Sequence, residues 1–152
     1  MKTREHCHSE SFATSPKKLF QLLHTPSAIC EWWGAAQAIV MPETEGLWVA
    51  IWGASQDKPD YTTAADIRVF EPPRRMELEN YRYRAKEGNL PFEAEFITRF
   101  EVEPEADGAR LTVTQEGFPA GPEADEYFAA CERGWSETFE GIRRYLGSAS
   151  VD

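Results

Sequence analysis

A long amphipathic helix near the end of the chain constrains the fold more than any other feature of the sequence. Its predicted start is Gly121-Pro122, with acidic residues in the first turn, and Arg143-Arg144 lie in the last turn before Gly147, a C-cap residue. The apolar positions share one face at helical spacing: Phe128, Cys131, Trp135, Phe139, Ile142 and Leu146. With a rise of about 1.5 Å per residue the helix is roughly 37 Å long. Its apolar face therefore needs a long partner.

The partner that the sequence offers is a β-sheet. From about residue 36 the apolar period changes to two, and the predicted strands cover 37–42, 46–52, 62–71, 75–84, 92–103 and 109–117. A more polar first strand is expected at 4–13. After it, Ser15-Pro16 predicts the start of a short helix, and a second short helix reaches Trp32-Trp33-Gly34. The alternation is typical of an antiparallel sheet with one solvated face.

This order of elements predicts an α+β fold in which a curved seven-stranded antiparallel sheet wraps around the C-terminal helix. Residues 1–152 then form a single domain with a core at about 10–147. The chain is rich in rings (9 Phe, 5 Trp and 5 Tyr) and poor in Leu, Ile and Val. Large rigid rings fill a concave space poorly. An aromatic interior therefore favours a cavity, and a filled core is the alternative.

Composition excludes several classes of partner and compartment. The net charge of −10 opposes binding to nucleic acid or to anionic membranes, whereas an acidic surface could receive a basic protein partner. No apolar run reaches the roughly 20 residues that a membrane span needs, and the start of the chain lacks the apolar core of a signal peptide. Three cysteines without metal-like spacing predict free thiols in a reducing, cytoplasmic setting. No cofactor motif is found, so neither a cofactor nor a metal is expected.

Five short stretches, in order, resemble one known superfamily: 13–20 (ATSPKKLF), 31–34 (EWWG), 70–76 (FEPPRRM), 111–118 (LTVTQEGF) and 134–135 (GW). The chain is similar to the START-like superfamily, also called SRPBCC or the Bet v helix-grip fold, and to its branch named after the activator of heat-shock-protein ATPase. The resemblance implies a hydrophobic cavity between the sheet and the C-terminal helix but no single activity. This sequence departs from the branch at Gly46, where two glycines are usual, and at Gln115, where His is frequent.

Strand alternation and the resemblance together predict the lining of that cavity. The inward set also includes Met76 and Leu111. Asn80 and Arg82 are placed inside because they continue the parity of Leu78. The predicted ligand-binding residues are Trp32, Trp33, Trp48, Trp52, Leu78, Asn80, Arg82, Phe96, Thr98, Phe100, Val113, Gln115, Trp135 and Phe139.

Some of these residues have two interpretations. Arg82 either recognises a ligand anion or extends to water at the cavity mouth, which we favour. The Trp32-Trp33 pair either forms a lid or packs into the core. Gly134 in mid-helix marks either a close approach of the helix to the sheet, which we favour, or a bend over a ligand. His6 and His8 share one face of a strand, and they either contribute two ligands to a metal site or lie on a solvated face. We favour the solvated face, because a zinc site needs three or four protein ligands and the sequence places no third one.

Three functions remain open at this stage. The first is a non-catalytic protein that holds a small hydrophobic or aromatic molecule, oriented by Asn80, Arg82 and Gln115. The second is a cavity enzyme of the cyclase or hydrolase type, which needs a titratable group in the cavity. The third is a co-chaperone-like interaction domain. Because no catalytic motif is present, we expect no catalytic residue and favour the first function.

Overall fold

The computed structural model describes residues 2–54, 57–86, 88, 90 and 92–149. The sheet contains β1 (Thr3–Phe12), β2 (Gln37–Val40), β3 (Leu47–Trp52), β4 (Tyr61–Glu71), β5 (Arg75–Ala85), β6 (Ile97–Glu105) and β7 (Gly108–Pro119). The helices are α1 (Pro16–Gln21), α2 (Pro26–Trp33), the single 3₁₀ turn η1 (Pro122–Ala124) and α3 (Asp125–Ala149). These bounds lie close to the predicted segments.

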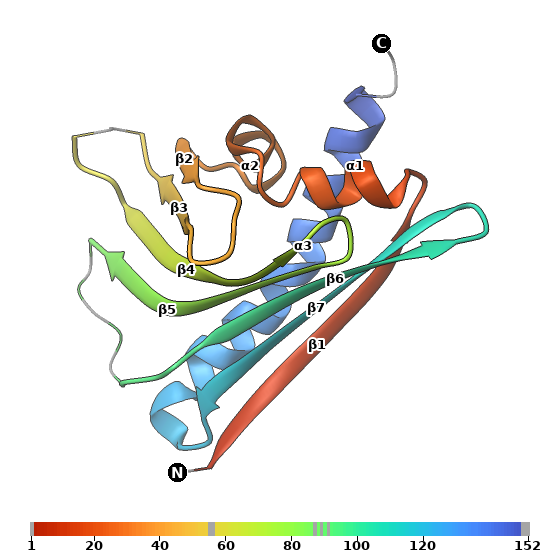
Figure 1. Ribbon diagram of the computed structural model, residues 1–152. Coiled ribbons are helices and arrows are strands. Elements are labelled where there is room, and N and C mark those ends of the chain that lie inside the picture. Colours follow the sequence, from red (N-terminus) through yellow and green to blue (C-terminus); the bar gives the residue numbers. More distant parts are fainter. Residues whose placement is uncertain (1, 55–56, 87, 89, 91, 150–152) are drawn as a thin grey trace.

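The seven strands form one antiparallel sheet in the order β1-β7-β6-β5-β4-β3-β2. The sheet curves around α3, and α1 and α2 lie at one end of it (Figure 1). The predicted helix-grip architecture is therefore confirmed. Among the described residues, no helix is long and apolar enough to cross a membrane.

Two boundaries differ from the prediction. The strand expected at 92–103 begins only at Ile97, which pairs with Glu116. The next residue of β7, Gly117, has a φ of 93°, and this turned backbone ends the regular pairing. At the other end of the chain Gly147 lies inside α3 and is not its C-cap, because the helix continues to Ala149.

Local signals set the short helices as predicted. The Ser15 side chain accepts a hydrogen bond from the Lys18 backbone N–H at 3.2 Å, and Pro16 is the first helical residue of α1. Two tryptophans tie these helices to the rest of the core. Trp32 Nε1 donates to the Leu22 carbonyl (2.8 Å), and Trp48 Nε1 donates to the Leu23 carbonyl (3.1 Å). Each buried indole N–H thus has a partner, as burial requires.

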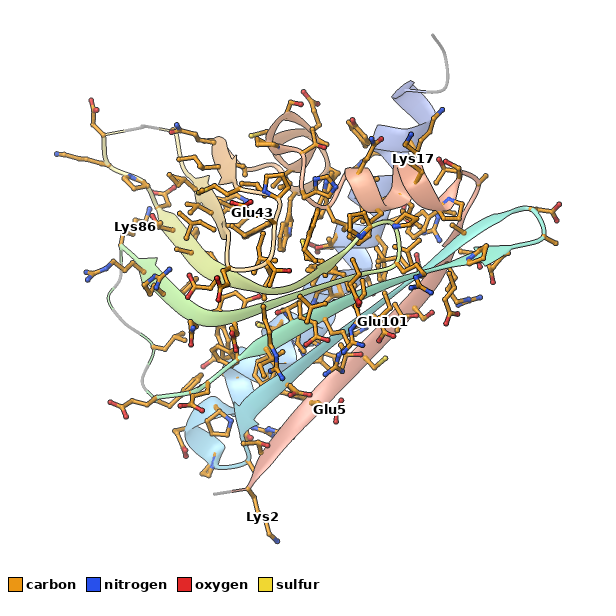
Figure 2. All side chains as sticks on the ribbon, viewed as in Figure 1. Lys2, Glu5, Lys17, Glu43, Lys86 and Glu101 are labelled. Atoms are coloured by element: carbon orange, nitrogen blue, oxygen red, sulfur yellow. The ribbon has the colours of Figure 1, made fainter. Side chains whose placement is uncertain are left out.

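Charged side chains lie on the face of the sheet that is turned away from α3. Glu5 of β1 and Glu101 of β6 lie on the face turned away from α3 (Figure 2). On the same face Glu77 is 2% exposed, and its carboxylate is paired with three arginines, Arg68, Arg75 and Arg99. Three cations around one buried carboxylate compensate its lost hydration.

Candidate ligand cavity

A cavity of about 220 Å³ lies between the inner face of the sheet and α3. Its walls combine rings from the strands with one stripe of the helix. The lining residues are Trp33, Trp48, Trp52, Thr63, Leu78, Tyr81, Tyr83, Phe96, Thr98, Phe100, Gln115, Phe118, Tyr127, Cys131, Gly134, Trp135 and Thr138. The members from α3 are spaced so that they fall on one helical face.

Tryptophans enclose one end of the cavity. The Trp33 ring is the centre of this group, with centroid distances of 5.7 Å to Trp48, 5.6 Å to Trp52 and 5.8 Å to Trp135. It also stacks on Trp32 at 5.0 Å, with 11° between the planes. Trp33 therefore packs as a fixed part of the wall, which supports the packing interpretation over the lid.

Phenyl and phenol rings enclose the other end. Phe96 lies 4.9 Å from Phe118 and 5.9 Å from Tyr127, measured between ring centroids. Tyr83 meets Tyr127 edge-on at 6.3 Å, and Phe92 packs on Tyr127 at 5.7 Å. Although residue 96 precedes β6, its ring still closes the cavity.

A string of polar side chains crosses the cavity wall. The Tyr81 hydroxyl donates to Thr98 Oγ1 at 2.6 Å, and Gln115 Nε2 donates to the same oxygen at 3.2 Å. Trp135 Nε1 then donates to Gln115 Oε1 at 3.0 Å. These bonds satisfy buried polar groups from β5, β6, β7 and α3, and they fix the amide orientation of Gln115.

The titratable groups in the lining are phenols and one thiol. Burial raises the pKa of Tyr81 above its usual range, and the hydrogen bond to Thr98 opposes this only in part. Burial is also the main cause that raises the pKa of Tyr127 and of Cys131. All three groups are therefore neutral at neutral pH. Among the described lining residues there is no Asp, Glu, His, Lys or Arg.

Nine of the fourteen predicted site residues line this cavity: Trp33, Trp48, Trp52, Leu78, Phe96, Thr98, Phe100, Gln115 and Trp135. Three others lie in the packed core behind it. Trp32 is 4% exposed, Val113 0% and Phe139 2%, so they support the wall rather than form it.

Asn80 and Arg82 lie outside the cavity, and their predicted inward orientation is wrong. Arg82 pairs with Ala64 and Glu79 pairs with Asp66, so three steps along β5 match two along β4. This bulge is at Asn80, whose φ is 55°. The extra residue inverts the alternation. The Asn80 and Arg82 side chains consequently bond to Asp66, at 3.1 and 3.2 Å, on the outer face.

The same bulge explains why sequence reasoning missed Tyr81 and Tyr83. Beyond it, the inward positions of β5 are odd-numbered, so both phenol rings enter the cavity. The sequence carries a signal for this change, because the apolar parity shifts from Leu78 to Tyr81 across Asn80, a residue type that tolerates positive φ.

Other lining residues were also missed. Thr63, Phe118, Tyr127, Cys131 and Thr138 line the cavity, and those on α3 could have been found by adding the helical positions adjacent to Trp135.

Gly134 does not mark a close approach between helix and sheet. A Cβ built at Gly134 has nothing within 4 Å, because the residue faces the cavity. The close approach is at Gly141, where a Cβ would collide with the Trp32 carbonyl and where α2 crosses α3. The preference for close packing at Gly134 is therefore wrong, and the nearby Gly141 fills that role.

The predicted solvated face at His6 and His8 is also wrong. His6 is only 5% exposed, and its ring lies 5.0 Å from Phe118 and 5.2 Å from Phe128. His6 is buried under α3 and His8 is half-buried beside it. In the described ranges, no three His, Cys, Asp or Glu side chains are grouped so that they could hold a metal ion.

Comparison with known proteins identifies relatives of the whole fold. The family model described as "Activator of Hsp90 ATPase homolog 1-like protein" matches residues 13–147. Among curated proteins, no match is found.

Solved structures share the architecture at low sequence identity. Protein MLL2253 from Mesorhizobium loti is 18% identical, with a TM-score of 0.77 over 95% of this chain and 98% of that one. An uncharacterised protein from Rhizobium leguminosarum is 17% identical, with a TM-score of 0.77 over 97% and 96%. The AHSA1 protein from Silicibacter pomeroyi is 20% identical, with a TM-score of 0.70 over 96% and 99%. At such identities the similarity establishes the fold only.

Proposed function

The chain belongs to the family of activator of Hsp90 ATPase homolog 1-like proteins, and we propose that this member is a binding protein for a small hydrophobic or aromatic molecule. The ligand occupies the cavity between the sheet and α3. The observation that carries the proposal is the cavity of about 220 Å³, which is lined mainly by aromatic rings. Concave, mostly apolar sites with a few convergent polar groups are the usual sites of small-molecule binding.

The lining supplies affinity by removing apolar surface from water. A ligand that buries roughly 200 Å² of apolar area gains about 5 kcal/mol before association costs. Rings at Trp33, Trp48, Trp52 and Trp135 add favourable edge and face contacts for a planar ligand.

The polar groups of the lining favour binding over proton transfer. General acid–base catalysis needs a group that titrates near the working pH. Burial holds the pKa of Tyr81, Tyr127 and Cys131 above their usual ranges, so each keeps its proton. The carboxylates and histidines of the chain that the structure describes lie outside the lining.

Native mass spectrometry of the protein with two uncharged probes, 2-naphthol and 1-dodecanol, tests the proposal. The wild type is expected to form a 1:1 complex with at least one probe. The variant Gly134→Leu places a side chain in the open space of the cavity and is expected to weaken that complex at least tenfold. Gly147→Leu lies on the same helix but outside the lining and serves as the control. No complex with either probe, or equal binding by Gly134→Leu, would overturn the proposal.

A further inference from the structure

The dimensions and charge of the cavity limit which molecules fit it. An engineered cavity of about 150 Å³ binds benzene, and the cavity here is about 220 Å³. The volume here is thus larger by roughly half than a cavity that holds one benzene ring, and a second fused ring has room. A long acyl chain would extend beyond the enclosed volume.

Charge limits the ligand further. An ion transferred into a ring-lined cavity loses its hydration and needs a charged partner there. Arg82 could have been such a partner, but the bulge at Asn80 turns it to the outer face, where Asp66 pairs with it. None of the described lining residues is charged. Anions and cations are therefore both excluded by desolvation.

Thr98 and Gln115 together offer a hydrogen-bonding position at the wall. Thr98 Oγ1 accepts bonds from Tyr81 and Gln115, so its own hydroxyl proton is left to donate, in the part of the chain that the structure describes. The Gln115 amide, which uses one N–H for Thr98, has a second one to offer. A ligand with an oxygen acceptor at this place satisfies both donors.

From these three observations, and resting on the proposed function, we infer that the ligand is an uncharged compound with one ring or two fused rings and a hydroxyl or carbonyl oxygen. The oxygen lies against Thr98 and Gln115, and the rings lie among the tryptophans. Phenols, indole-type carbonyl compounds and naphthols belong to this class.

A matched set of probes distinguishes this inference from the proposed function. The set comprises 2-naphthol, naphthalene, 2-naphthoate, 2-naphthylmethylammonium and 1-dodecanol, each titrated while the tryptophan fluorescence is followed. We expect 2-naphthol to bind tightest, naphthalene about tenfold more weakly, and the two ions and the alcohol at least a hundredfold more weakly. In Thr98→Val, which removes one of the two donors, the preference for 2-naphthol over naphthalene is expected to decrease.

The outcomes separate cleanly. If an ion or the long alcohol binds tightest and Gly134→Leu abolishes that binding, the ligand class is wrong and the proposed function stands. If no probe binds in a manner sensitive to Gly134→Leu, the proposed function itself fails. The wild-type ranking decides the matter even if Thr98→Val does not fold.

A second inference comes from the interface between β1 and α3. Alternate residues of β1 face the helix: Arg4, His6, His8, Glu10 and Phe12. Arg4 pairs with Asp125 at 2.5 Å and Glu10 pairs with Arg143 at 2.7 Å, so ion pairs of opposite polarity join the strand to both ends of α3. We call these contacts the β1–α3 seam.

The centre of the seam is a histidine pair, with His6 buried and His8 half-buried. His6 Nδ1 and His8 Nε2 are 2.9 Å apart, and one shared proton makes this a hydrogen bond. In the described structure His6 Nε2 has no hydrogen-bond partner. The His8 ring stacks on Trp135, a wall of the cavity, at 6.5 Å between centroids.

We propose that the seam loosens as the pH falls and thereby opens the cavity beside Trp135. Two imidazolium rings in direct contact repel, and the buried His6 ring cannot be rehydrated while α3 covers it. The charged groups that face the pair are Arg4 and Glu10 from β1 and Asp125, Glu132 and Arg143 from α3, whereas its β7 neighbours Val113 and Gln115 are neutral. Burial and His8 lower the pKa of His6 more than Glu132 raises it.

Hydrogen exchange followed by mass spectrometry tests the seam. Between pH 7.5 and 5.0, after correction for intrinsic exchange, the amides of β1 and α3 are expected to lose at least tenfold in protection while β4 and β5 lose less. The loss is expected to vanish in His6→Phe/His8→Gln and to persist in His24→Gln. Equal losses in the double variant, or a uniform loss across the sheet, would overturn the proposal. If the double variant does not fold, ring NMR of the wild type decides: two independent titrations near pH 6.5 would refute a coupled pair.

Discussion

Replacement of Gly134 by alanine is expected to stabilise the protein. A glycine in a packed helix often marks a place where no larger side chain fits, but Gly134 faces the open space of the cavity. The residue lies within the 25-residue helix α3, and a Cβ there has nothing within 4 Å. In a helix interior, Gly→Ala gains about 1 kcal/mol. The methyl group also covers part of the cavity wall, worth up to about 0.8 kcal/mol per carbon buried. We therefore expect a free energy of unfolding higher by about 1–2 kcal/mol.

Urea denaturation at fixed pH measures this change, and two neighbouring glycines provide the controls. Gly147→Ala lies near the exposed end of α3, so a gain below 1 kcal/mol is expected. Gly141→Ala forces a Cβ onto the Trp32 carbonyl and is expected to cost about 1–3 kcal/mol. The same Gly134→Ala protein should bind 2-naphthol more weakly, because the cavity is smaller. A destabilised Gly134→Ala would refute the open space beside α3.

Three further predictions concern other parts of the molecule. Glu77→Gln leaves the arginines around it without their shared carboxylate and is expected to lower the free energy of unfolding by about 1–3 kcal/mol, measured in urea. Burial lowers the pKa of His6, His8 and His24 below 6.5, so the unfolded chain binds more protons than the folded one. The free energy of unfolding should therefore be highest above pH 6.5 and fall as the pH drops below it. A urea midpoint that stays unchanged down to pH 5 would refute this. Thr98→Val leaves Tyr81 without its acceptor and should cost about 1–3 kcal/mol, and an unchanged midpoint would argue against the polar string.

The architecture could be predicted because its signals are local. Ser15-Pro16 caps α1 through its own side chain and ring, and period-two alternation defines the strands without knowledge of their partners. The long apolar stripe of α3 then leaves the sheet as the one partner of sufficient length. Element order and the helix-grip arrangement follow from these signals together.

The site could be predicted only in part because alternation fails at irregularities. A parity rule carried through Asn80 places Arg82 inside, whereas the bulge places Tyr81 and Tyr83 there. The parity rule thus makes Arg82 a candidate for recognition of a ligand anion, whereas the cavity is lined by neutral residues. The free volume beside Gly134 is equally hidden from the sequence, since it depends on how side chains from five strands and α3 meet.

The polar first strand shows a different limit. A solvated face at His6 and His8 is what the sequence predicts, but α3 supplies aromatic rings for them and ion pairs on both sides. Polarity indicates a solvated face only where no partner covers it. That partner lies more than a hundred residues away in the chain.

A crystal structure of the complex with 2-naphthol shows whether the ring-lined space between the sheet and α3 receives an uncharged aromatic molecule. We expect the two rings of the probe to lie among Trp33, Trp52 and Trp135, with the hydroxyl oxygen within hydrogen-bond distance of Thr98 or Gln115. Density for the probe on the outer face of the sheet, or a cavity that collapses and stays empty at saturating 2-naphthol, would contradict it.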